Sequence, residues 1–154
     1  MSRIDKHLAE LGIVLPQPSK PVANYVPWVR TGNLVFVSGQ VAVEAGKVMY
    51  PGQLGTDVTL EDGIKAARMC ALSVIAQLKD ACGGDLDKVR RIVKLVGFVN
   101  AAPGFTDHPK VVNGASDLMV EVFGDKGRHA RSAVGSPSLP LNLSVEVEAI
   151  AEIE

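Results

Sequence analysis

The sequence has few of the features that mark nucleic-acid-binding proteins. Its 154 residues carry 16 basic and 17 acidic side chains, for a formal net charge of −1, and only 5% of them are aromatic. Proteins that bind nucleic acid gain affinity from an excess of positive charge, and those that bind single strands also stack bases on aromatic side chains. We therefore expect no nucleic-acid partner.

Long apolar runs are also lacking. No stretch of 18 apolar residues occurs, and charged side chains interrupt the first ten residues, where a signal peptide would have an apolar core. The two cysteines, Cys70 and Cys82, do not have the CxxC spacing of redox and zinc motifs, which fits reduced thiols. These absences predict a cytoplasmic protein with no membrane partner.

Metal-binding motifs are missing as well. The three histidines, His7, His108 and His129, are far apart in the sequence, and none belongs to an HExxH or His/Cys pattern. Gly83-Gly84 lacks the context of a phosphate-binding loop and is better explained as the end of a helix. We expect neither a metal nor another cofactor.

Apolar residues make up 47% of the chain, enough for one domain over residues 1–154 with its own core. Ile4, Leu8 and Leu11 predict a short amphipathic helix over residues 3–12, and a proline-rich extended segment leads on to about residue 20. The alternation of apolar and polar residues in strands, helical spacing of apolar residues and turn-forming residues between them predict the remaining elements. We expect strands over 25–30, 34–43, 48–49, 91–100, 131–135 and 142–153, and helices over 59–82 and 109–123.

This order predicts an α+β fold, with a mixed six-stranded sheet and two helices packed on one face. In the strand over 91–100, Ile92, Val96 and Phe98 are expected on one face, opposite Val93, Leu95 and Val99. The last strand alternates between apolar residues and glutamates or Ser144. The uncovered face of the sheet needs a further partner, so we expect a homo-oligomer with ligand pockets at its seams.

Arg131 is the most informative candidate for a functional residue. It precedes a short apolar strand, and the next strand carries Glu146 and Glu148. A guanidinium group binds a carboxylate through two parallel hydrogen bonds, so Arg131 is a candidate ligand for a small organic acid. The alternative is a structural salt bridge from Arg131 to Glu146 or Glu148.

Five ordered segments resemble the RidA/YjgF family, which is also labelled endoribonuclease L-PSP. The similarity covers about residues 21 to 153, and the segments are Asn24–Val26, Gly32–Gln40, Val112-Asn113, Ala130–Ser132 and Val145–Ile150. The resemblance implies a chorismate-mutase-like fold and a homotrimer with three clefts between subunits. It also implies hydrolysis of reactive enamine or imine intermediates, such as 2-aminoacrylate, to 2-keto acids and ammonia.

The resemblance also implies roles for single residues. Arg131 would hold the substrate carboxylate, and Glu146 would position or activate water; the alternative for Glu146 is a solvated strand residue. Tyr25, Ser38, Gly39 and Asn113 would line the cleft. Their alternatives are a core aromatic for Tyr25, a strand bulge for Ser38-Gly39, and a residue on the helix surface for Asn113.

Two departures from the family pattern mark the chain as a longer side branch. Ala133 stands where members often have cysteine, so at this position only backbone groups are available to a substrate. The N-terminal helix and the loop over 135–140 are also additional. Beside the deaminase hypothesis, two others remain: a non-catalytic or regulatory trimer that binds small carboxylates, such as keto acids, and a ribonuclease, which the neutral charge and few aromatics disfavour.

Overall fold

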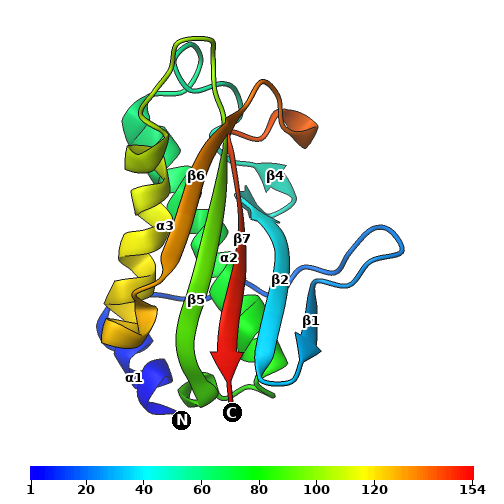
Figure 1. Cartoon of the computed structure of the whole chain (residues 1–154), viewed down its shortest axis with the longest axis vertical. Coiled ribbons are helices and arrows are strands. Elements are labelled where there is room, and N and C mark those ends of the chain that lie inside the picture. The colour runs from blue at the N-terminus through cyan, green and yellow to red at the C-terminus, as the bar shows by residue number, and fades with distance from the viewer.

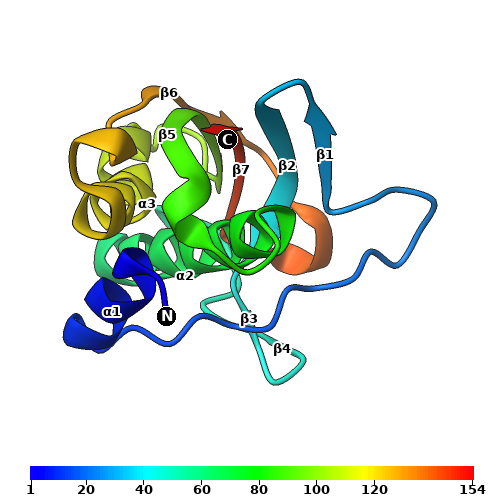
Figure 2. The same cartoon turned by 90° about the horizontal axis from the view of Figure 1, so that it is seen from below.

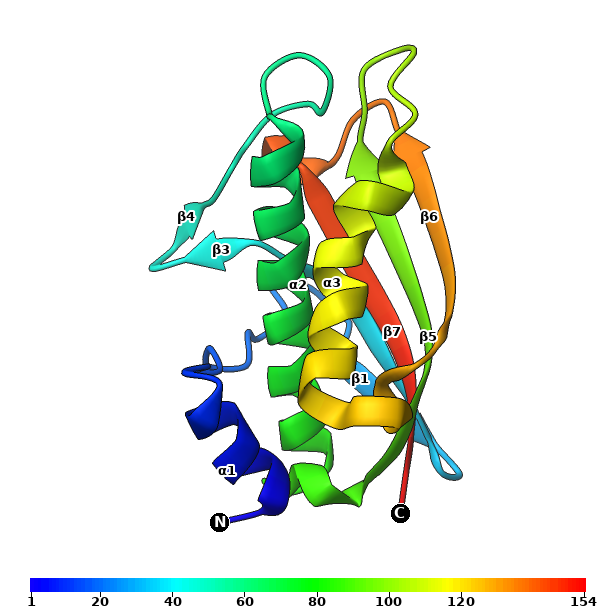
Figure 3. The ribbon, with the colours of Figure 1, turned by 90° about the vertical axis from the view of Figure 1, so that its left-hand side faces the viewer.

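The computed structural model describes residues 1–154 and has a five-stranded sheet with helices on one side (Figures 1 and 3). The sheet order is β1-β2-β7-β5-β6. Its strands are β1 (Trp28–Thr31), β2 (Leu34–Val41), β5 (Val89–Asn100), β6 (Ala130–Ser136) and β7 (Val145–Ile153). The helices are α1 (Arg3–Glu10), α2 (Leu60–Ala81) and α3 (His108–Phe123), with short 3-10 turns at Leu86–Lys88, Gly124–Gly127 and Pro140–Asn142.

The predicted α+β class is confirmed, and so is the mixed sheet. Strands β5 and β6 pair in parallel, and the other pairs in the sheet are antiparallel. The main sheet has five strands rather than six, because β3 (Val43–Glu44) and β4 (Lys47–Val48) pair only with each other. Strand β1 begins at Trp28 rather than Tyr25. Pro27 immediately precedes it and has no N–H to donate to a neighbouring strand.

The face assignment for β5 was wrong at Ile92. Register shifts between Val89 and Arg91 and between Ile92 and Lys94 change the alternation of the strand. Ile92 is therefore fully buried in the core together with Leu95, whereas Val96 is only half-buried on the other face. A bulge of this kind cannot be recognised from alternation alone, because it is the bulge that breaks the alternation.

The strand β7 alternates as predicted. Its odd-numbered residues from Val145 to Ile153 are buried on the face that the helices cover, and Glu146, Glu148 and Glu152 lie on the opposite face. Apolar side chains are exposed on that opposite face, including Phe36 at 42% and Val29 at 52%. One chain leaves this face of its sheet without a covering layer, and its burial by a second copy stays a prediction.

The two long helices begin and pack as their sequences favour. The Thr59 hydroxyl accepts a hydrogen bond from the backbone N–H of Asp62 and so caps the first turn of α2. At the crossing of α2 and α3, the carbonyl of Ile64 lies against the Cα of Gly114, where a Cβ would overlap it. None of the helices combines the length and the apolar character needed to cross a bilayer.

The helix α1 is fastened to the turn before β5. The Asp87 carboxylate accepts hydrogen bonds from the backbone N–H groups of Arg3 and Ile4, and Lys79 of α2 binds Asp5 at 2.7 Å. The chain then runs past α2 toward the edge of the sheet (Figure 2). On the way, the buried Gln77 side chain donates to the carbonyl of Ser19. We call residues 12–22 of this segment the strap.

Candidate functional site

Arg131 is held by the helix α3. It lies on β6 in register with the buried Leu95, so its side chain projects from the helix-covered face of the sheet. Its Nη1 atom donates to Asn113 Oδ1 at 2.7 Å and to Ser116 Oγ at 3.1 Å. Asn113 and Ser116 are three residues apart in α3, which places both side chains on one side of the helix.

These two bonds use both N–H groups of Nη1 and leave the rest of the guanidinium available. The Nε and Nη2 atoms make no hydrogen bond, and Arg131 belongs to no ion pair within the chain. The structural alternative, a salt bridge to Glu146 or Glu148, is therefore not formed. The Nε/Nη2 edge is one of the two edges of arginine that match the two oxygens of a carboxylate.

Glu146 lies on β7, on the face that the helices leave open. Its side chain passes directly over Gly39 of β2, where an added Cβ would lie 2.7 Å from Glu146 Cδ and 2.9 Å from Cγ. Burial raises the pKa of the Glu146 carboxyl above its ordinary value, and the charge of Glu148 on the same face raises it further. A carboxyl group of this kind can exchange a proton closer to neutral pH.

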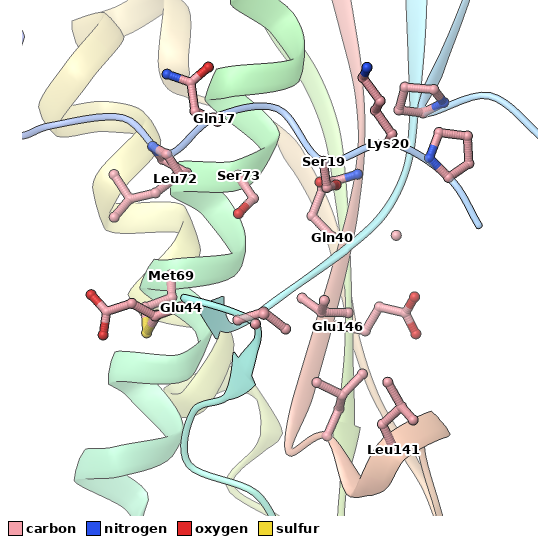
Figure 4. A pocket seen from close by; sticks show the side chains of 18 of the residues that line it. Gln17, Ser19, Lys20, Gln40, Glu44, Met69, Leu72, Ser73, Leu141 and Glu146 are labelled. Atoms are coloured by element: carbon pink, nitrogen blue, oxygen red, sulfur yellow. The ribbon is translucent and has the colours of Figure 1, made fainter.

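Glu146 and Gly39 line a large cavity, which has a volume of about 950 Å³ and also contacts Tyr25. Figure 4 shows the side chains of Met69 and Leu72, from α2, on one side of this pocket and Glu146 on the other, with its carboxylate turned away from α2. The strap forms a further wall. Tyr25 is 54% exposed, so it is not a core aromatic.

Ser38 has a local structural role. Its hydroxyl lies 2.9 Å from the carbonyls of both Val26 and Pro27, which connects β2 to the segment that carries Tyr25. The register of β2 against β7 shifts between Val37 and Gln40, so the bulge considered for Ser38-Gly39 is present. The bulge places Gly39 beside Glu146, and Ser38 does not line the large cavity.

The candidate residues form two groups on opposite faces of the sheet. Arg131 is in register with Leu95, whereas Glu146 is in register with Phe98, three residues farther along β5. One group contains Arg131 and Asn113, together with Ala133, which shares the face of Arg131 and is half-buried. The other group is Tyr25, Gly39 and Glu146. A single chain does not bring the two groups together.

Two polar residues near Arg131 were not predicted from the sequence as part of the site. Ser116 binds the guanidinium, and His129 binds Ser116. The sequence does show that Ser116 lies one helical turn after Asn113. This spacing points to Arg131 only once α3 is known to pack against β6. No group of three His, Cys, Asp or Glu side chains lies close enough to hold a metal ion.

Comparison with known proteins supplies the family. The family model described as "YjgF/chorismate mutase-like, putative endoribonuclease" matches residues 5–153. The chain belongs to the YjgF/RidA family. The resemblance of the five sequence segments is thereby confirmed, and the family match begins within α1 and includes the strap as well as the sheet.

Relatives in the YjgF/RidA family match nearly the whole chain. Protein TCP17 of Trypanosoma cruzi is 47% identical over 152 residues, which cover 98% of this chain and 94% of that protein. The crystal structure of Atu1372 from Agrobacterium tumefaciens, a protein of unknown function, superposes with a TM-score of 0.92 at 49% identity and covers 98% and 92%. A more distant relative, at 29% identity over 92% of this chain and 95% of its own length, is the 2-iminobutanoate/2-iminopropanoate deaminase of Dermatophagoides farinae.

Proposed function

We propose that this protein hydrolyses small reactive 2-imino acids to 2-keto acids and ammonia. The observation that carries the proposal is the free Nε/Nη2 edge of Arg131, which Asn113 and Ser116 hold in place through Nη1. Imino and keto acids share a carboxylate that fits this edge. The related deaminase of Dermatophagoides farinae supports the choice of reaction.

The reaction needs both groups of residues, so the cleft must lie between two copies of the chain. Arg131 of one copy would hold the substrate carboxylate, and Glu146 of the next copy would face the imine carbon. The uncovered sheet face with its exposed Phe36 and Val29 supports such an assembly. We propose a closed homotrimer, in which each interface would contain one cleft.

The chemistry is an addition followed by an elimination. Water adds to the C=N carbon of the protonated imine while Glu146 accepts a proton from the water, which gives a tetrahedral carbinolamine. Glu146 then returns that proton to the nitrogen. As the C–N bond breaks and ammonia leaves, the hydroxyl group gives its proton to Glu146 and the C=O bond forms. The raised pKa of Glu146 suits a group that must both accept and donate a proton.

The test uses imines generated in the assay by an amino-acid oxidase, with keto acid and ammonia as products. Each charge-assisted hydrogen bond to a carboxylate contributes about 1.5–3 kcal/mol, so Arg131→Ala should lower kcat/KM by about 100-fold or more. Arg128→Ala is the matched control, because the Arg128 side chain is 70% exposed and forms an ion pair only with Asp125. An Arg131→Ala enzyme with wild-type kcat/KM would refute the proposal. Arg131-dependent binding of keto acids without any turnover would favour the small-carboxylate binder.

A mixing experiment tests the shared cleft. Arg131→Ala and Glu146→Gln chains are each expected to be inactive alone. When the two are unfolded and refolded together, about a quarter of the clefts should combine an intact arginine with an intact glutamate. Recovery of about that fraction of wild-type activity supports a site built from two chains, and no recovery from properly refolded mixed assemblies would contradict it.

A further inference from the structure

Behind Arg131 lies a chain of hydrogen bonds that the proposed reaction does not use. Ser116 Oγ, which accepts from Arg131 Nη1 at 3.1 Å, also lies 2.9 Å from His129 Nε2. On the other side of the imidazole ring, His129 Nδ1 lies 2.6 Å from the carbonyl oxygen of Gly127. Four groups are thus connected in series, from the guanidinium to the backbone.

The partners assign every proton in this series. The carbonyl of Gly127 can only accept, so Nδ1 of His129 carries a hydrogen. In the neutral ring Nε2 is then an acceptor, and the Ser116 hydroxyl donates to it. The oxygen of Ser116 keeps its lone pairs for Arg131. All bonds therefore run in one direction, from Arg131 through Ser116 and His129 to Gly127.

The far end of the series is anchored in the packing of the fold. Gly127 is buried in the 3-10 turn after α3, and the Met119 carbonyl of α3 lies against its Cα, where a Cβ would overlap it. The turn is therefore packed directly against the helix. His129, which leads into β6, is thereby fixed, and it fixes the direction of the Ser116 hydroxyl.

We infer that Ser116 and His129 are positioning residues for the carboxylate site, an inference that rests on the proposed function of Arg131. Asn113 holds one N–H of Nη1, and a single hydrogen bond leaves the guanidinium free to rotate about it. The second bond, to Ser116, stops this rotation and so fixes the direction of the Nε/Nη2 edge. Such pre-organisation favours ligand binding because less freedom is lost on association.

A positioning role has a different kinetic signature from a structural one. Ser116→Ala removes one of the two anchors but leaves Arg131 its charge and its bond to Asn113. We expect KM, and the Kd for 2-oxobutanoate measured by calorimetry, to rise about fivefold while kcat stays within about twofold. Ser136→Ala is the control, because it removes a serine hydroxyl from β6 that bonds only the Ser138 carbonyl.

A double-mutant cycle tests whether His129 acts through Ser116. His129→Ala alone should raise Kd by about twofold to threefold, and Ser116→Ala/His129→Ala should bind no more weakly than Ser116→Ala. The melting temperature of each variant is measured as well, so that weaker binding caused by unfolding is recognised. An unchanged Kd in Ser116→Ala, or single effects that multiply in the double variant, would overturn the inference.

The unmutated protein provides a test that needs neither turnover nor ligand. Nitrogen-15 NMR distinguishes the two neutral tautomers of an imidazole, and His129 is expected with its hydrogen on Nδ1. A neutral His129 with its hydrogen on Nε2 would reverse the series and overturn the inference. A wild-type protein that fails to hydrolyse imines defeats the proposed function instead, so the two failures are distinguishable.

Discussion

Adding one methyl group at Gly39 should disable Glu146 without unfolding the protein. In Gly39→Ala the new Cβ would lie within 3 Å of Glu146 Cδ and Cγ, closer than carbon atoms can approach, so the glutamate must swing off β2. The backbone of Gly39 does not have a positive φ, so alanine is allowed there. Glu146 is only partly buried and has room to move.

The size of the effect follows from the role of the displaced group. A general base contributes about 10²- to 10⁴-fold to rate, and a misplacement of about 1 Å can cost 100-fold. We therefore expect kcat for imine hydrolysis to fall about 100-fold in Gly39→Ala. The free energy of unfolding should fall by only about 1 kcal/mol, because rotation of one side chain relieves the overlap. Keto-acid release and urea denaturation measure the two quantities.

The decisive control places the same methyl group where the glutamate is absent. In a Glu146→Ala background the space over residue 39 is empty, so adding Gly39→Ala should cost no further activity. Independent losses that multiply in the double variant would show that Gly39 acts by another route. Wild-type kcat in Gly39→Ala alone would refute the reasoning, because the carboxylate would then not need its present place.

Three more outcomes are expected. Because the charge of Glu148 helps to raise the pKa of Glu146, Glu148→Gln should move the acid limb of the kcat/KM profile to lower pH, and an unmoved limb would contradict this. The hydrogen bond from Lys79 lowers the pKa of Asp5, so the stability that this bond contributes is fully present above pH 3.8 and is lost as pH falls through the lowered pKa of the folded state. The free energy of unfolding of Lys79→Met, measured in urea, should therefore approach that of the wild type in acid. A difference between the two proteins that does not change with pH would contradict this. Burial raises the pKa of the Cys70 thiol, so alkylation followed by mass spectrometry should modify it only in the unfolded chain.

Much of the fold could be predicted because its elements follow local rules. The helix that begins close to residue 59 was predicted from sequence, and so was the alternation of β7, since a strand with one buried face repeats every two residues. The errors arose where pairing overrides the local pattern. Ile92 was placed on the wrong face by an unseen bulge, and Val43 to Val48 formed a ribbon of their own.

The site was predictable only in part, for a related reason. Arg131 and Glu146 stand out as single residues, and the resemblance to a family named their roles, but the sequence does not reveal that they project from opposite faces of the sheet. Ser116 and His129 were missed because a serine on a helix and a histidine before a strand have no meaning until the two elements are adjacent.

The crossing of the two long helices has a consequence for how this protein can change. Gly114, which has no side chain between its backbone and the carbonyl of Ile64, immediately follows Asn113. A larger residue at 114 would separate the helices and shift Asn113 and Ser116 together. Substitutions that repack the contact between the helices should therefore also change which ligands the site prefers. In directed evolution, substitutions at this contact and substitutions in the site are expected to accumulate together.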